Sequence, residues 1–202
     1  RKQQQVLADG IHHNVGGGGT PACVACHGVH DVQRAKGSDR SHCARCHAPE
    51  VNDYLSSVHG VALAKGDTDA STCRGCHGAT HALRAHTDSL STVSRDRLDD
   101  TCARCHANRQ LMTRRKITIP QAVQLFRGSV HGKSNKWNAA RCSDCHESHR
   151  LRRANDPTSS IYRANIPATC GKCHKRETAA YLTGVHGTAL TRGVTASPVC
   201  TD

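Results

Sequence analysis

Aromatic and other bulky apolar side chains are scarce in this sequence of 202 residues. It holds one Trp, one Phe, one Met and three Tyr, and only 36% of its residues are hydrophobic. A chain of this composition cannot fill an ordinary core with large side chains. Its interior must therefore contain other apolar material, unless the chain is largely disordered. Sixteen histidines favour the first explanation, because imidazole is the commonest metal ligand.

Long hydrophobic runs and blocks of like charge are also missing. No segment is apolar over the length of a membrane-spanning helix, so we expect no transmembrane segment. The formal net charge of +12 suggests an acidic partner. However, no run of five basic residues occurs and side chains for base stacking are nearly absent, so we expect no nucleic-acid binding. Because the sequence opens at Arg1 without Met, we expect a mature or trimmed segment whose targeting signal has been removed.

Twelve of the thirteen cysteines fall into six copies of the pattern Cys-x-x-Cys-His. The copies are Cys23, Cys26 and His27; Cys43, Cys46 and His47; Cys73, Cys76 and His77; Cys102, Cys105 and His106; Cys142, Cys145 and His146; and Cys170, Cys173 and His174. This spacing is the haem c attachment signature, since two thiols add to the vinyl groups on one porphyrin edge and the following His binds iron. Zinc knuckles do not require that His, a redox dithiol would occur once, and a disulfide framework seldom repeats one local motif. We therefore predict six covalently bound haem c groups.

Six haems would leave about 34 residues for each, and their porphyrins would supply the apolar interior that the side chains do not. Their propionates would lower the formal charge from +12 to about +6 in the ferric state, and reduction would bring it near zero. Helical patterns are short and no strand alternation persists. We predict a mostly irregular chain with short α-helices, wrapped around a line of stacked haems, with little or no β-sheet.

Ten histidines lie outside the motifs, and seven of them recur in two patterns. One group directly follows the first, third and fifth motifs and comprises His30, His81 and His149. The other group follows a β-branched residue and lies 11 or 14 residues ahead of the first Cys of a motif; it comprises His12, His59, His131 and His186. Most members of this upstream group precede a glycine suited to a left-handed helix cap, which would place each His in a last helical turn. Both groups are candidates for the second axial ligand of the haem irons.

These features define a repeat: an upstream His, a motif with a trailing His, and a second motif without one. The repeat predicts diheme units at 1–58, 59–130 and 131–185 and the start of a fourth at 186–202, all within one continuous haem-cored domain. We pair the upstream His with the first haem of its unit and the trailing His with the second, while the reverse pairing or an exchange between units stays open. His86 could replace His81, and His13 could replace His12 or ligate a haem in a neighbouring subunit. His42 is either solvated or bonded to a propionate.

The thirteenth cysteine, Cys200, lies 14 residues after His186, the same separation as from His59 to Cys73. The sequence Val-Cys-Thr-Asp around it matches the beginning of another motif. We therefore predict that Cys200 is the first Cys of a seventh haem site and that the natural chain continues into a fourth unit. A free reactive thiol is the alternative.

The trailing-His motif followed by a plain one, with Ser-Val-His-Gly ahead of it, resembles multihaem c-type cytochromes. This family includes periplasmic electron conduits and extracellular cytochromes that polymerise into conducting filaments. The resemblance covers nearly the whole chain and implies bis-His haems in a line, with a periplasmic, extracellular or cell-surface location. It also implies redox partner proteins or extracellular acceptors, and a homopolymer where filaments form.

We favour an electron carrier without catalytic turnover. The alternative is a nitrogen or sulfur oxyanion reductase in which one iron lacks its second ligand. No Cys-x-x-Cys-Lys motif is present to favour a reductase, and the histidines are numerous enough for every haem.

Overall fold

The computed structural model describes residues 2–13, 22–28, 30 and 40–202, and these contain thirteen short α-helices, two 3-10 helices and no strand. The α-helices are α1 (Lys2–Ala8), α2 (Ala22–His27), α3 (Arg40–Ala44), α4 (Ala48–Ser56), α5 (Val58–Ala64), α6 (Cys73–His77), α7 (Leu98–His106), α8 (Arg109–Arg114), α9 (Ala122–Gly128), α10 (Cys142–His146), α11 (Ile166–Gly171), α12 (Lys175–Thr183) and α13 (Val185–Thr191). The 3-10 helices are η1 (Thr80–Ala82) and η2 (Arg163–Asn165). The predicted fold of short helices and irregular segments is confirmed. Within the described ranges, no helix is long and apolar enough to span a membrane.

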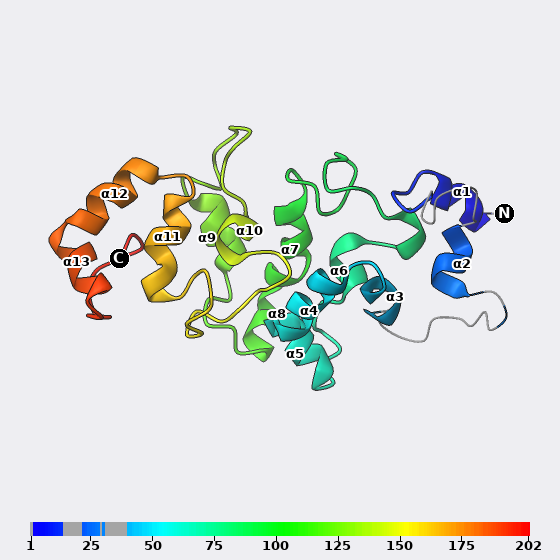
Figure 1. Cartoon of the computed structure of the whole chain (residues 1–202), viewed down its shortest axis with the longest axis horizontal. Helices are drawn as coiled ribbons and strands as arrows, with labels where there is room; N and C mark the ends of the chain where they lie inside the picture. The colour runs from blue at the N-terminus through cyan, green and yellow to red at the C-terminus, as the bar shows by residue number, and fades with distance from the viewer. Residues whose placement is uncertain (1, 14–21, 29, 31–39) are drawn as a thin grey trace.

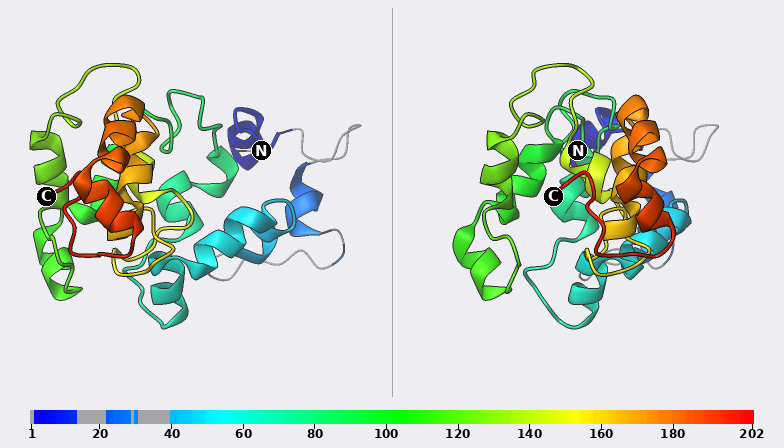
Figure 2. Two further views of the ribbon diagram at one scale, coloured as in Figure 1. Left: turned by 60° about the vertical axis from the view of Figure 1, so that its left-hand side comes forward. Right: turned by 90° about the vertical axis from the view of Figure 1, so that its left-hand side faces the viewer.

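The order of the helices follows the long axis of the molecule. Helices α1 and α2 lie near one end and α12 and α13 at the other, with α7 between them (Figure 1). After a turn of 60° the N-terminal and C-terminal helices still lie toward opposite sides, whereas the view turned by 90° looks along the long axis (Figure 2). Motifs that are neighbours in the sequence are therefore neighbours in space, as a linear array of sites requires.

The apolar core of the polypeptide is very small. The buried hydrophobic residues are Val51, Ala103, Met112, Ala139, Leu190 and Val199. The accessible surface is 14015 Å². A compact folded protein of 21.7 kDa exposes about 9,200 Å². The side chains alone therefore do not fill the interior, in agreement with the composition.

The segment around His59 differs from the single helix expected there. Helices α4 and α5 are separated by Ser57, so His59 lies in the first turn of the second helix and not in the last turn of the first. The Ser57 hydroxyl donates to the carbonyl of Tyr54 at 2.7 Å and accepts from the N–H of Gly60 at 3.1 Å. The expected left-handed glycine cap is wrong, because Gly60 lies within α5. A Cβ on Gly60 would collide with the Tyr54 carbonyl, so a close approach of backbone explains this glycine.

The same close approach recurs after two other upstream histidines, His131 and His186. A Cβ on Gly132 would collide with the carbonyl of Phe126, and one on Gly187 with the carbonyl of Tyr181. Ser129 repeats the two hydrogen bonds of the first serine, to Phe126 at 2.7 Å and from Gly132 at 3.2 Å. The Val-His-Gly signature thus marks a tight corner that follows a helix and carries the histidine.

Candidate functional site

Four of the six cysteine pairs lie on short helices. The first motif of each unit lies on α2, α6 or α10, and α7 carries the fourth motif. In the second and sixth motifs only the first cysteine lies in a helix, α3 or α11. Cysteines three residues apart on a helical turn share one face, which suits attachment to a single porphyrin edge. Burial raises the pKa of the Cys76 and Cys145 thiols, so both stay protonated at neutral pH.

Five pairs of imidazole rings recur through the structure, and each pair joins a motif His to a His from outside the motifs. The pairs are His12–His47 (6.1 Å between ring centroids), His27–His81 (6.0 Å), His59–His106 (6.1 Å), His77–His149 (6.0 Å) and His131–His174 (6.1 Å). The separation is nearly constant, although the angle between the rings varies from 9° to 60°. Direct ring packing does not hold the centroid distance constant while the angle changes, so a common spacer between the rings explains these values better.

One iron atom bound between the two rings would give this separation of the ring centroids. Imidazole nitrogen binds a metal at about 2 Å and the ring centre lies about 1.1 Å behind the nitrogen, so two opposed ligands have centroids about 6 Å apart. The five pairs at 6.0–6.1 Å fit this arrangement. The residues therefore suit a haem iron held between two imidazoles, with the adjacent cysteine pair available for the porphyrin.

Burial favours the neutral form of several motif and paired histidines. Burial is the main cause of a lowered pKa at His12, His59, His77 and His106, and at the motif histidine His146. A second cause at His59 is the facing His106, and at His77 it is the facing His149. Neutral imidazole has the free lone pair that metal binding needs.

We preferred to pair the upstream histidine with the first motif of its unit and the trailing histidine with the second. The ring pairs of the structure contradict this preference. Three of the four upstream histidines, all but His186, face the second motif of their own unit, as His59 faces His106. Each paired trailing histidine faces the first motif of the preceding unit, as His149 faces His77. The ring pairs at the first motifs of the first and second units are therefore formed between units and not within one unit.

The two kinds of site also differ in ring orientation. At the first motif of the first and second units, which contain His27 and His77, the two paired rings are close to parallel, with interplanar angles of 25° and 9°. At the second motif of each of the three units, the two paired rings are inclined to one another by 53° to 60°. Near-parallel and inclined ring pairs thus alternate over the first four motifs.

A backbone hydrogen bond joins the segment of a trailing histidine to the segment of an upstream histidine at two junctions between units. The N–H of Ile11, just before His12, donates to the carbonyl of Leu83 at 2.7 Å. The N–H of Val58, just before His59, donates to the carbonyl of Leu151 at 2.9 Å. Each leucine lies two residues after a trailing histidine, so the bond fixes the segment of the trailing histidine beside the upstream histidine of the preceding unit.

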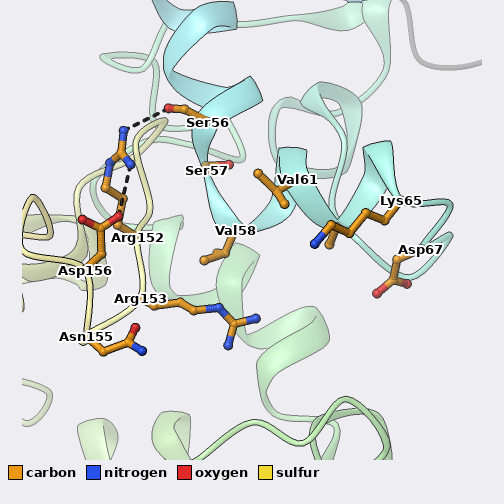
Figure 3. Close-up of a pocket in the computed structure, with 11 residues that line it drawn as sticks. Ser56, Ser57, Val58, Val61, Lys65, Asp67, Arg152, Arg153, Asn155 and Asp156 are labelled. Carbon is orange, nitrogen blue, oxygen red and sulfur yellow. Dashed lines mark hydrogen bonds and ion pairs between the residues drawn. The ribbon is translucent and has the colours of Figure 1, made fainter.

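Side chains reinforce the second of these junctions (Figure 3). The Arg152 guanidinium donates to the Ser56 hydroxyl at 3.3 Å and pairs with Asp156 at 3.2 Å. An open pocket of about 460 Å³ lies between α5 and the segment that follows His149, and Lys65 and Arg153 contribute to its lining. The trailing segment therefore rests on the helices that present His59.

Within each unit, a basic side chain of the second motif binds the backbone of the first. In every case the third residue of the second motif donates to the carbonyl of the third residue of the first motif. The bonds run from Arg45 to Ala25 at 3.1 Å, from Arg104 to Gly75 at 2.7 Å and from Lys172 to Asp144 at 3.4 Å. Sequence analysis missed this clamp, although the basic residues stand at matching positions in the second, fourth and sixth motifs.

Several histidines lie outside these five ring pairs in the described part of the chain. They are His13, His30, His86, His146 and His186. The His13 ring donates through Nδ1 to the carbonyl of Gly10 at 2.9 Å, which gives it a local role. The roles predicted for His30 and His186 as ligands stay predictions.

The segment around Cys200 repeats the arrangement of the fifth motif. Arg163 pairs with Asp202 at 2.6 Å, as Arg95 pairs with Asp144 at 3.1 Å. Each arginine also donates to two carbonyls ahead of the motif: Arg95 to Trp137 at 3.3 Å and Ala139 at 2.7 Å, and Arg163 to Thr195 and Ser197 at 2.8 Å. The bond to Arg163 lowers the pKa of the Asp202 carboxyl. Cys200 is thus held as the first cysteine of the fifth motif is held.

Near Cys142 and near Cys200, a thiol of the neighbouring motif makes the same kind of contact. The thiols of Cys102 and Cys142 share a hydrogen bond, which raises the pKa of Cys142 and lowers that of Cys102. Cys170 and Cys200 share the corresponding bond. The first cysteine of the fourth motif thus lies beside Cys142, and that of the sixth motif beside Cys200.

Comparison with protein families identifies one match. Residues 135–179, which contain the fifth and sixth motifs, match the family described as the doubled CXXCH motif. No curated protein and no solved structure shows significant similarity to the chain. The family match supports a multihaem protein of the c-type cytochrome kind, which binds haem c covalently and transfers electrons.

Proposed function

We propose that this chain is an electron carrier with six haem c groups in a line and with two imidazoles on each iron of the five described pairs. The observation that carries this proposal is the constant 6.0–6.1 Å separation of those pairs, each of which includes a motif histidine. We place the protein in the periplasm or at the cell surface, with redox proteins or extracellular acceptors as partners. A homopolymer would extend the same line beyond one chain.

The residues of the chain serve electron transfer in three ways. When bound, haem iron supplies the one-electron chemistry. The paired imidazoles would both bind the iron, so substrates would be excluded and little rearrangement would accompany a change of charge. The clamps from Arg45, Arg104 and Lys172 hold the two attachment sites of each unit next to one another.

The proposal predicts that reduced protein binds little carbon monoxide. Carbon monoxide needs an open iron, and the five imidazole pairs close five of the six predicted sites. We expect at most one carbon monoxide per six haems in an optical titration, with full reversible reduction and reoxidation. Binding at two or more irons would show that the ring pairs do not ligate iron and would contradict the proposal.

A reductase is the second candidate, and one observation favours it. His146 belongs to no ring pair among the residues that the structure describes, so its iron is the candidate open site. This hypothesis predicts turnover of nitrite or a sulfur oxyanion by the reduced protein, and loss of turnover when Cys142 and Cys145 are both replaced by Ser. Absence of turnover in the wild-type protein would exclude nitrite and sulfur oxyanion reduction.

A further inference from the structure

We propose that the hydroxyls of Thr92 and Ser160 position two motif histidines, His77 and His146, by holding the peptide carbonyl ahead of each. The inference rests on the proposed function, because it concerns how two of the proposed haems keep their iron ligands in place. It gives a role to the connector, which we define as residues 88–95 in the second unit and 156–163 in the third. The connector contains no histidine and no cysteine, so the haem chemistry leaves its role open.

The carbonyl ahead of each motif histidine accepts the hydrogen bond. The Thr92 hydroxyl donates to the carbonyl of Cys76 at 2.6 Å, and the Ser160 hydroxyl donates to that of Cys145 at 2.5 Å. These carbonyls lie in the last turns of α6 and α10, where the carbonyls of a helix have no partner within it. A side chain from a later segment therefore supplies the donor at both helix ends.

A bond to this carbonyl acts on the histidine that follows it. The peptide group is planar, so the Cys76 carbonyl and the His77 N–H share one plane. Once that plane is fixed, only rotations within His77 itself set the direction of its ring. The ring lies nearly parallel to that of His149, at 9°. Groups that hold a ligand in this way orient it and tune the metal that it binds.

The fourth motif holds its corresponding carbonyl differently. The N–H of Asn108 donates to the carbonyl of Cys105 at 2.9 Å, so the donor is the local backbone. The rings of His106 and His59 are inclined by 53°. The near-parallel and the inclined ring pair of this unit therefore differ in the group that holds the carbonyl ahead of the motif histidine.

The connector is itself anchored, so it can serve as a support. Thr101, directly ahead of the fourth motif, donates through its hydroxyl to the carbonyl of Thr92 at 2.6 Å. The equivalent hydroxyl of the third unit donates to the carbonyl of Ser160 at 2.7 Å. Three residues after Thr92, Arg95 pairs with Asp144 of the fifth motif at 3.1 Å. The connector of the second unit is thus bonded to both motifs of its own unit and to the next motif along the chain.

The test compares Thr92→Val with Thr92→Ser in the haem-loaded protein. Valine lacks the donor, whereas serine keeps it, as the equivalent Ser160 does. The largest g value of low-spin ferric haem is higher for inclined axial imidazoles than for parallel ones. We expect Thr92→Val to raise this g value in one ferric signal and to shift the midpoint potential of one haem, because His77 can then turn. Thr92→Ser should match the wild type in electron paramagnetic resonance and in spectroelectrochemistry.

Two further variants separate positioning from general stability. Ser91→Ala removes the adjacent buried hydroxyl, which donates to the carbonyl of Arg84 at 3.3 Å and not to a motif. This variant should lower the thermal midpoint and leave the g values unchanged. Ser160→Ala should shift the midpoint potential of one haem, and the shift should vanish when Cys142→Ser and Cys145→Ser remove the fifth haem. If Thr92→Val does not fold, Ser160→Ala decides the question.

The inference is overturned if Thr92→Val, or in its place Ser160→Ala, keeps the wild-type signals and potentials. It is also overturned if Thr92→Ser changes them as much as Thr92→Val does. A third contrary result is a change that survives Cys73→Ser and Cys76→Ser, which remove the third haem. A wild-type protein that attaches no haem would instead contradict the proposed function, so the two failures are distinguishable.

Discussion

Replacement of His149 by Ala is expected to open the iron bound by His77, which belongs to the preceding unit. The rings of His77 and His149 are separated by 6.0 Å and inclined by 9°, so removal of one imidazole leaves the other as the sole axial ligand. We expect one additional carbon monoxide per chain in the reduced protein and one additional high-spin ferric signal. Optical titration and electron paramagnetic resonance measure these two changes.

The assignment of this open iron can be checked by removing its haem. In a protein that combines His149→Ala with Cys73→Ser and Cys76→Ser, the additional carbon monoxide should disappear. His86→Ala is the matched control, since His86 also follows a motif closely but lies outside the ring pairs of the described residues. An additional site that persists without the third haem would show that His149 serves another iron and that ligands are not exchanged between units.

Replacement of Gly132 by Ala is expected to destabilise the protein and to release His131 from its partner. The new Cβ would collide with the carbonyl of Phe126, so the corner that carries His131 cannot close. Overpacking of this kind costs about 1–3 kcal/mol or more, and here it also separates His131 from His174. We expect a lower thermal midpoint and one additional carbon monoxide per chain.

Gly128→Ala is the control for this substitution. Gly128 ends α9 only four residues earlier, and a Cβ there would meet no atom within 4 Å. Alanine is favoured over glycine in a helix by about 1 kcal/mol, so the control should be neutral or slightly stabilising. If Gly132→Ala unfolds no earlier than Gly128→Ala and keeps the sixth iron closed, close backbone approach does not explain the Val-His-Gly signature.

The sequence was sufficient to predict the fold class, because scarce bulky side chains and six evenly built motifs leave little room for another architecture. It also identified the histidines that the structure brings opposite motif histidines, such as His59 and His131. Their local patterns repeat, and repetition is visible without coordinates. These parts of the account depend on spacing along the chain alone.

The partners of those histidines could not be read from spacing. The segment of Leu151 crosses to the preceding unit and bonds with Val58, and this contact carries His149 to His77. A long-range backbone contact leaves no mark in either local pattern, so the pairing within units was chosen wrongly. The glycine after His59 was misread for a related reason, since a close approach to Tyr54 and a left-handed cap both favour glycine.

Two positioning features left signals that are visible once the motifs are aligned. The basic residue in the third position of the second, fourth and sixth motifs forms the clamp within each unit. An aspartate in the third position, Asp144 or Asp202, receives an arginine from the preceding segment. Neither residue binds haem in the motif chemistry, so comparison of the variable positions is the signal that would have found them.

The most direct test of the account is a count of covalently bound haems on the 202-residue chain. The protein would be produced in a host that matures c-type cytochromes, unfolded in acid and weighed intact by mass spectrometry. Thioether bonds survive unfolding, so the account predicts a mass equal to the polypeptide plus six haems. A polypeptide that carries no haem, or that releases zinc on unfolding, would contradict it.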